Sequence, residues 1–546
     1  MARKAPRTGS RGAVDDATPL KQRDSSADAP FYAWYVLGVL FLVYVLNFID
    51  RSIVSILAQA IKADLRLADQ ELGFLYGTAF AVFYALFGIP LGRLADGWYR
   101  GRLIAIGLIA WSSMTALSGF ATSFEELAIA RIGVGIGEAS ASPAAYSLLA
   151  DHFPARKRAL VLAIYTAGLY VGGGLSLPIG GSVAHAWTMR FAAGTAPLGL
   201  AGWQAAFLAV GLPGLVLALW VLTLREPPRG LAEGRPSPVV RPGAWRAFAR
   251  ELVAVMPPCT LWSVSRFPGA LPRNLAALGT IGAVAFALAR LSGDGLQWGT
   301  LGIGVYAAFS WTQMLHATDR PTYTLLFGTR AITLALCGFG AIAYISYSLA
   351  FWAPPYAMRT FGVRADVAGR MLGIPGAFAS AVGCVTGGYL ADVWKRHDAR
   401  ARLFVCMLAA SLPVPLLFAA LAVSQVESFY VLYALTVFVA YLWVGPAAAA
   451  VQDCMLPRMR GVAGAIFLLA VSILGLGLGP YATGKVAALT GTLRGGMASM
   501  AFVAPLACCL LWLASRHIGA AETTRAARAA AAGEEASFSA SALRQD

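Results

Sequence analysis

Apolar runs of about 20 residues recur along almost the whole chain, and no other feature restricts its possible folds more strongly. A helix of about 20 residues is long enough to cross a hydrocarbon core of about 30 Å. Of the 546 residues, 58% are hydrophobic and only 13% are charged. That is too little charge to cover the water-exposed surface of a soluble protein of this size. The sequence therefore predicts an all-α integral membrane protein.

Twelve of the runs are predicted as membrane spans. They cover residues 31–57, 73–91, 103–120, 127–150, 159–183, 205–224, 331–356, 371–390, 403–423, 430–451, 462–481 and 497–513. Two more runs, 275–289 and 296–315, flank a turn-like Ser-Gly-Asp-Gly sequence and predict a central helical hairpin. Because the first of these two runs is short, the helix count is fourteen with the hairpin or twelve without it.

The runs divide the chain into five expected segments. They are a disordered tail (1–30), a six-helix bundle (31–225), a central linker with the hairpin (226–325), a second six-helix bundle (326–515) and a second tail (516–546). Within the linker, residues 245–256 mix Arg and Glu with apolar side chains. This stretch is either an amphipathic helix on the membrane surface or a solvated linker helix.

Basic residues are concentrated in short segments that follow every second predicted span. They are Arg93, Arg100, Arg102, Arg156, Lys157, Arg158, Lys395, Arg396, Arg400, Arg402, Arg458 and Arg460. Short basic loops stay on the cytoplasmic side of a membrane, so both chain termini are expected in the cytoplasm and the protein in the inner membrane. Arg359 and Arg364 do not fit this pattern. The distribution also argues that the net charge of +16 serves topology and not nucleic-acid binding.

An internal repeat relates the two halves. Gly92-Arg-Leu-Ala-Asp96 followed by Arg100 recurs 296 residues later as Gly388-Tyr-Leu-Ala-Asp392 followed by Arg396. Asp151, which follows the fourth span, recurs 302 residues later as Asp453. Such a repeat is expected for two pseudo-symmetric six-helix bundles related by an axis along the membrane normal.

The repeated loops resemble the signature of the major facilitator superfamily. More narrowly, the sequence Leu46-Asn-Phe-Ile-Asp-Arg51 and the segment from Arg131 to Ser140 are similar to the spinster-like branch. The resemblance implies alternating-access transport of a lipid-like organic anion, such as a lysophospholipid or a sphingoid compound, coupled to protons. It also implies that the loop residues Gly92, Asp96, Arg100, Gly388, Asp392 and Arg396 form a conformational gate.

Among the charged residues inside predicted spans, three stand out: Asp50, Arg131 and Glu138. A charge inside a membrane is costly unless it is paired or hydrated, so each is a candidate functional residue. At 1.5 Å per residue, Asp50 and Arg131 lie at similar depth in the outer third, which predicts an ion pair. Glu138 lies seven residues further on, about 10 Å deeper on the same helix face, and could carry a proton. The alternative is a static salt bridge that holds two helices together.

Polar and aromatic residues of several spans are candidates for the substrate cavity. With Arg131 and Glu138, they are Asn47, Tyr165, Tyr344, Tyr347, Trp352 and Tyr441. Simple packing is the alternative for each of them. The segment Gly479-Pro-Tyr-Ala-Thr-Gly-Lys485 resembles a phosphate-binding loop, but Val486 replaces the required Ser or Thr and the segment ends an apolar run.

The scattered histidines and cysteines predict no metal site, and no catalytic constellation predicts an enzyme. We expect no cofactor apart from protons as the coupling ion. The expected partners are a small amphiphilic or anionic substrate and membrane lipids, with no nucleic acid, and the expected state is a monomer. A non-transporting receptor or a passive lipid scramblase on the same fold is the alternative function.

Overall fold

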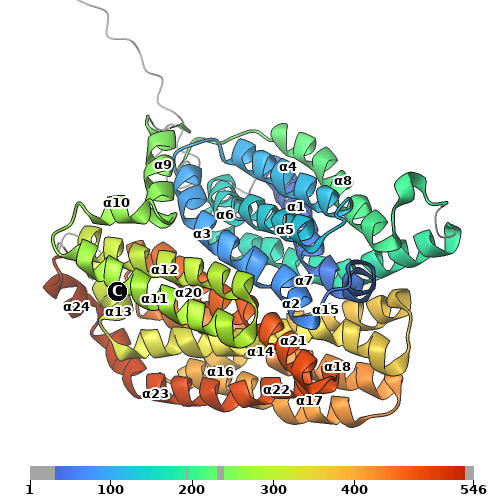
Figure 1. The fold of residues 1–546 in the computed structure, drawn as a ribbon. Coiled ribbons are helices and arrows are strands. Elements are labelled where there is room, and N and C mark those ends of the chain that lie inside the picture. The colour runs from blue at the N-terminus through green and yellow to red at the C-terminus, as the bar shows by residue number, and fades with distance from the viewer. Residues whose placement is uncertain (1–30, 192–194, 230–238, 241, 535–546) are drawn as a thin grey trace, which may run out of the picture.

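A computed structural model describes residues 31–191, 195–229, 239–240 and 242–534, and the predicted first tail lies outside them. The all-α prediction is confirmed. Two helical bundles lie side by side, with the first half of the chain in the upper part of Figure 1 and the second half below it.

The first bundle contains eight α-helices and one short 3-10 turn. They are α1 (Phe31–Leu65), α2 (Asp69–Tyr76), α3 (Thr78–Ala95), α4 (Arg100–Ser118), α5 (Phe124–Glu138), α6 (Ala141–His152), α7 (Ala155–Arg190), η1 (Pro197–Gly199) and α8 (Gly202–Leu222). Two predicted spans are each divided in two, because the chain bends at Gly77 between α2 and α3 and at Ala139–Ser140 between α5 and α6.

The central segment forms the predicted hairpin and three shorter helices. They are α9 (Ala244–Val255), α10 (Thr260–Val264), α11 (Ala270–Ser292), α12 (Gly295–Thr318) and α13 (Arg320–Phe327). Helix α9 lies across the end of the bundle and packs on α3, where Trp98 and Trp245 meet edge to face at 5.2 Å. Its apolar face is thus covered by protein, while Arg246 on the other face is exposed.

The second bundle repeats the first with more interruptions. It contains α14 (Arg330–Phe361), α15 (Ala365–Lys395), α16 (Ala401–Ser411), α17 (Pro413–Ala422), α18 (Val426–Ala440), α19 (Val444–Asp453), η3 (Pro457–Met459), α20 (Arg460–Ala470), the π-helix η4 (Val471–Gly477), α21 (Gly479–Thr490), α22 (Leu493–Ser499), η5 (Met500–Phe502), α23 (Val503–Thr523) and α24 (Arg525–Ala531). Within the predicted second tail (516–546), α23 continues to Thr523 and α24 follows it.

Within the described residues, twelve helical stretches are long and apolar enough to cross a membrane. They include α11 of the hairpin. They do not include α12, whose composition is more polar, or the broken pair α5 and α6. The fourteen-helix count of the sequence therefore stays a prediction. It requires α12, which at 24 residues is long enough to span, and it requires α5 and α6 to cross together as one broken span.

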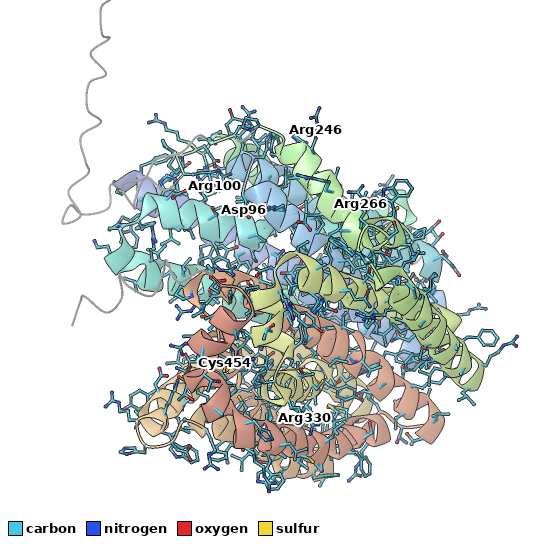
Figure 2. The ribbon with its side chains drawn as sticks, turned by 90° about the vertical axis from the view of Figure 1, so that its left-hand side faces the viewer. Asp96, Arg100, Arg246, Arg266, Arg330 and Cys454 are labelled. Carbon is cyan, nitrogen blue, oxygen red and sulfur yellow. The ribbon has the colours of Figure 1, made fainter. Side chains whose placement is uncertain are left out.

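The two ends of the bundle differ, and we name them by their residues. The proximal end carries Arg100, α9 and α24, and the distal end carries Asp69, Gly181 and Ala365. Figure 2 looks onto the proximal end, with Asp96, Arg100 and Arg246 on the first half of the chain and the central segment, and Cys454 on the second half.

The distal end is closed by direct backbone contact between the two bundles. A Cβ atom on Gly181 of α7 would lie 2.4 Å from the carbonyl oxygen of Ala365, where α15 begins. A Cβ atom on Gly77, at the bend between α2 and α3, would lie 2.3 Å from the carbonyl oxygen of Leu476 in η4. Only glycine permits an approach this close, so these positions hold the halves together.

Candidate functional site

Glu138 forms a buried ion pair with Arg51, a residue that the sequence analysis had not singled out. The Nη2 atom of Arg51 lies 2.7 Å and its Nε atom 3.2 Å from Oε2 of Glu138. The Glu138 side chain is fully buried and the Arg51 side chain is 9% exposed. Asn47, one turn before Arg51 on α1, also lies beside Glu138. The pair therefore joins α1 to the end of α5.

Arg131 does not form the expected side-chain ion pair with Asp50, and that part of the prediction was wrong. Its Nη1 atom donates to the backbone carbonyl of Asp50 at 3.1 Å, and its Nη2 atom lies 3.5 Å from the carbonyl of Arg51. The predicted matching depth of Asp50 and Arg131 is nevertheless seen in this contact. The helix direction places the Asp50 backbone, and not its carboxylate, within hydrogen-bonding reach of the guanidinium.

The Asp50 carboxylate is fully buried beside Trp111 and Thr115. Within the described part of the chain, neither of its oxygens has a hydrogen bond of good geometry, and neither does Oε1 of Glu138. Two buried carboxylates with spare acceptor atoms are groups that can take up a proton, because an ionised buried carboxylate needs compensating donors.

Arg51 also faces the central cavity between the bundles. The cavity has a volume of about 240 Å³. Its wall includes Arg51, Ser52, Ser55, Tyr76, Tyr170, Tyr347, Tyr433 and Tyr441, with apolar and small residues of α7, α14, α15, α18 and α20. The guanidinium lies over the rings of Phe48 and Phe80, at 4.5 and 4.3 Å from their centroids. These rings and Glu138 hold the cation at the cavity wall.

Only two of the six polar and aromatic cavity candidates line this cavity, namely Tyr347 and Tyr441. Tyr165 stacks on Tyr44 at 4.5 Å, and Tyr344 packs near Thr483. Trp352 donates from its indole nitrogen to the carbonyl of Pro480 at 2.9 Å. These three side chains are packing residues in this conformation.

The remaining candidate, Asn47, lies behind the cavity wall, and so do the charged residues Arg131 and Glu138. Tyr76, Tyr170 and Tyr433 were missed by sequence analysis, because an aromatic residue in an apolar run does not show which way it faces. Arg51 carried a usable signal. It lies four residues after Asn47 and therefore on the same helix face.

Arg359 of α14, which did not fit the topology pattern, links the second half to the first half at the distal end. Its Nη1 and Nη2 atoms lie 2.7 and 2.6 Å from the Asp69 carboxylate, and its Nε atom lies 2.6 Å from Oε1 of Gln59. Lys62 reaches the same Asp69 carboxylate at 2.5 Å. Arg359 therefore closes the distal end, which explains a basic residue on that side.

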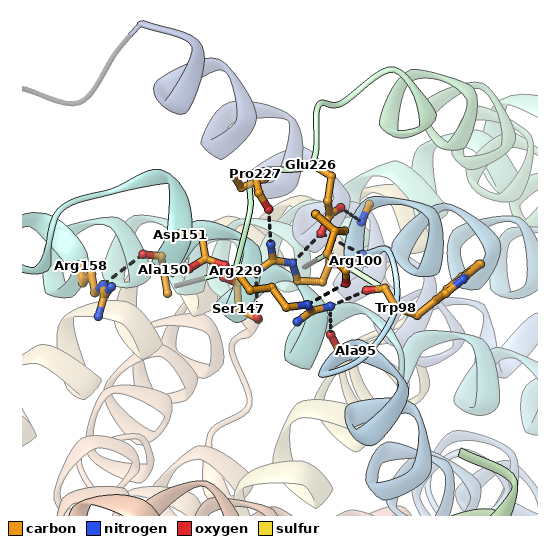
Figure 3. Close-up of polar contacts among 12 residues, drawn as sticks. Ala95, Trp98, Arg100, Ser147, Ala150, Asp151, Arg158, Glu226, Pro227 and Arg229 are labelled. Atoms are coloured by element: carbon orange, nitrogen blue, oxygen red, sulfur yellow. Dashed lines mark hydrogen bonds and ion pairs between the residues drawn. The ribbon is translucent and has the colours of Figure 1, made fainter. Parts of the chain in front are cut away.

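The predicted gate residues of the first half lie at the proximal end, around the buried guanidinium of Arg100 (Figure 3). Arg100 pairs with Asp151 and, at 2.6 Å from Nε, with Glu226 just after α8. Gly92 packs next to Pro143 of α6, and Asp96 caps the end of α3 with an exposed side chain. The network ties α4, α6 and the chain after α8 together.

The second half has a related network with different basic residues. Asp453, the repeat counterpart of Asp151, pairs with Lys395 and Arg402. Arg402 also lies 3.3 Å from Asp392. Gly388 packs against Gly445, whereas Arg396 is an exposed helix-capping residue. The repeat thus extends to contacts, but Arg402 at the start of α16 takes the place that the sequence spacing gave to Arg396.

Metal binding has no support in the described residues, where no group of three or more His, Cys, Asp or Glu side chains could hold an ion. What the geometry provides is a cation at a cavity between two bundles, buried carboxylates behind it and closure at one end. Together these features define the class: a membrane transporter built from two pseudo-symmetric halves.

Comparison with known proteins gives the family. The family model of the Major Facilitator Superfamily matches residues 40–480, and the chain belongs to that superfamily. It is a transporter of the spinster-like type and not an enzyme.

Two relatives and one solved structure illustrate the range of this similarity. The chain is 27% identical over 461 residues to an MFS-type efflux pump of Mycolicibacterium smegmatis, covering 84% of this chain and 85% of the relative. It is 30% identical over 204 residues to the hexuronate transporter of Bacillus subtilis, covering 37% of this chain and 44% of the relative. A bacterial homologue of the human lysosomal transporter Spinster, in an inward-facing and unoccupied conformation, superimposes with a TM-score of 0.68 at 25% identity, covering 90% of this chain and 98% of that one.

Proposed function

We propose that this protein is a proton-coupled secondary active transporter that moves an amphiphilic organic anion across the inner membrane by alternating access. The observation that carries the proposal is the position of Arg51. It is a cation on the wall of the central cavity, and its counter-ion Glu138 is a group that can be protonated.

The pair couples a proton to an anion by charge balance. While Glu138 is ionised, it neutralises Arg51, and a substrate anion gains little from approaching the cation. When Glu138 takes up a proton, Arg51 is left with an uncompensated charge at the cavity wall. A substrate carboxylate or phosphate then supplies the missing counter-ion. Proton and anion therefore favour each other's binding, as reciprocal coupling requires.

We propose that Asp50 and Arg131 support this exchange from behind. Arg131 bonds the backbone carbonyls of Asp50 and Arg51, so it fixes the turn of α1 that carries the cavity cation. The Asp50 carboxylate, buried near Arg131 and Trp111, is a second group that can hold a proton.

The cavity wall favours a substrate with an apolar part. Apart from Arg51, the lining consists of aromatic side chains, small hydroxyl residues, glycines and aliphatic side chains. An anionic lysophospholipid or a phosphorylated sphingoid compound would place its charge at Arg51 and its chain against α7 and α15. A sugar acid is the second candidate, supported by the match to a hexuronate transporter and by the modest cavity volume of about 240 Å³.

We propose that the proximal end is cytoplasmic, with both chain termini on that side. The basic loops around Arg100 and Arg402 lie there, as the positive-inside tendency requires. With the distal end closed, the structure then represents an inward-facing state. The loop residues Gly92, Asp96 and Arg100, with Gly388, Asp392 and Arg396, act as the gate that closes the proximal end in the opposite state.

The test is transport by the purified full chain in proteoliposomes. Uptake is measured for lysophospholipids, phosphorylated sphingoid bases and hexuronates, each with and without an imposed pH gradient and with a fluorescent pH indicator. The proposal expects saturable, gradient-driven uptake of an amphiphilic anion with proton movement. Sugar-acid uptake alone would replace the substrate class. Binding of a substrate without flux would indicate a receptor. Flux that does not depend on the pH gradient would indicate a scramblase. Either result would overturn proton-coupled transport.

A further inference from the structure

Gln297, in the first turn of α12, places a buried amide between the two halves of the transporter. It is 2% exposed. The hydroxyl of Thr78, the first residue of α3, lies 2.7 Å from Oε1 of Gln297. The Nε2 atom of Gln297 lies 3.4 Å from the carbonyl oxygen of Gly477 in η4. A side chain of the added hairpin therefore bonds the first half through Thr78 and the second half through Gly477.

This amide lies beside one of the close backbone approaches between the halves. Gly77 precedes Thr78 and has the carbonyl of Leu476 in the space of a side chain. Gly477 closes a π-helical segment, and a π-helix leaves a backbone carbonyl outside the regular α-helical hydrogen-bond ladder. Nε2 of Gln297 donates to that carbonyl, while the single hydroxyl proton of Thr78 is shared between the same carbonyl and Oε1 of Gln297. The break in α-helical geometry thus provides the acceptor for the bridge.

Ionic contacts attach the hairpin to the second half at both of its ends. At its tip, Asp294 lies 2.7 Å from Nζ of Lys485 and accepts a 2.7 Å hydrogen bond from the Tyr481 hydroxyl, both in α21. At the other end, Asp319 follows α12 and pairs with Arg458 at 3.1 Å. The sequence that resembled a phosphate-binding loop therefore uses its lysine to hold the hairpin.

The contacts of α12 with the first half are of a different kind. Ala307 packs with Val82 and Leu86 of α3 in a small apolar cluster, and Val255 of α9 completes it. Apolar contacts of this kind are not directional and can slide, whereas the ion pairs and the amide bridge need defined partners. The Thr78–Gln297 hydrogen bond is thus the directional contact between α12 and the helix that must move.

We propose that the α11–α12 hairpin is a brace fixed to the second half, and that Gln297 is a positioning residue that favours the distally closed state. This proposal rests on alternating access. When the distal end opens, α2 and α3 separate from η4 and α21. The Thr78–Gln297 contact then breaks, while Asp294 stays on Lys485 and the hairpin moves with the second half.

A distance measurement between spin labels tests the brace without any substrate, so its outcome is independent of the proposed transport activity. Labels are placed at the distal end on Ala63→Cys of α1 and Leu489→Cys of α21, in the full chain with its native cysteines replaced by serine. Gln297→Leu keeps the side-chain size and removes both hydrogen bonds. We expect the population with a long label distance to rise about fivefold or more.

Gln313→Leu is the matched control, because Gln313 lies on the same helix but bonds Asn274 within the hairpin. An unchanged distance distribution for Gln297→Leu, or an equal shift in the control, would overturn the proposal. If Gln297→Leu does not fold, Gln297→Asn is used, because it shortens the side chain by one methylene and moves the amide away from its partners. We expect the same rise in the population with a long label distance.

Cross-linking tests which half carries the hairpin. A short bifunctional thiol reagent on Thr78→Cys with Gln297→Cys should hold the label distance short at every pH. The same reagent on Asp294→Cys with Lys485→Cys should leave the distance distribution unchanged, because that contact persists in both states. Two results would contradict the assignment of the hairpin to the second half. One is opening of the distal end while the Thr78→Cys–Gln297→Cys cross-link is in place, and the other is a distal end held closed by the Asp294→Cys–Lys485→Cys cross-link.

Discussion

Replacing Glu138 with Gln separates proton carriage from simple ion pairing. Gln has the size of a protonated Glu and can still accept a hydrogen bond from Arg51, but it cannot release a proton. If Glu138 carries the coupling proton, a pH gradient no longer drives uptake in Glu138→Gln. Exchange of substrate across the membrane without a gradient survives, because the cavity and its cation remain.

The structure also indicates how much Glu138→Gln lowers the free energy of unfolding. Removing one partner of a fully buried ion pair costs about 3–5 kcal/mol. Arg51 is 9% exposed toward the cavity and lies over two aromatic rings, so water and the rings compensate part of its charge. The hydrogen bond that Gln keeps returns about 1 kcal/mol. We therefore expect Glu138→Gln to lower the free energy of unfolding by about 2–3 kcal/mol, while most of the protein stays folded.

The assay combines thermal unfolding of the purified variant with uptake and exchange in proteoliposomes. Glu125→Gln is the matched control, because it removes an exposed carboxylate from the same helix. The control should match the wild type in stability and in gradient-driven uptake. Gradient-driven uptake by folded Glu138→Gln at the wild-type level would refute proton carriage and leave Glu138 as a static partner of Arg51.

Three further substitutions test other parts of the structure. Arg51→Lys keeps the charge but loses the two-point contact with Glu138. We expect the affinity for the anion, measured in a ligand titration, to fall about tenfold or more. An affinity equal to that of the wild type would show that Arg51 does not bind the anion. Gly181→Val places a side chain against the Ala365 carbonyl, so labelling of distal cysteines should increase, whereas Gly38→Val, with open space around it, should leave labelling unchanged. Asp453→Asn removes two partly exposed ion pairs and should lower stability by about 1 kcal/mol at low salt, with a smaller difference at high salt; a salt-independent loss would contradict an electrostatic role.

The sequence alone determined the membrane class, the two-bundle architecture and the helical hairpin. Hydrophobic span length is set by the thickness of the bilayer, and buried charge is so costly in a membrane that Asp50, Arg131 and Glu138 were evident without coordinates. The repeat around Asp96 and Asp392 was evident for a similar reason, because it survives as a local pattern in both halves.

The tertiary structure decided which charges meet. Depth along a helix follows from the 1.5 Å rise per residue, and it correctly matched Asp50 with Arg131. The direction of a side chain around the helix axis depends on how each helix is rotated against its neighbours. Because of that rotation, Glu138 pairs with Arg51 and not with Arg131. Likewise, the bridge from Thr78 through Gln297 to Gly477 joins residues up to 399 positions apart. Such a contact cannot be predicted from the local sequence, because it forms only when the helices pack together.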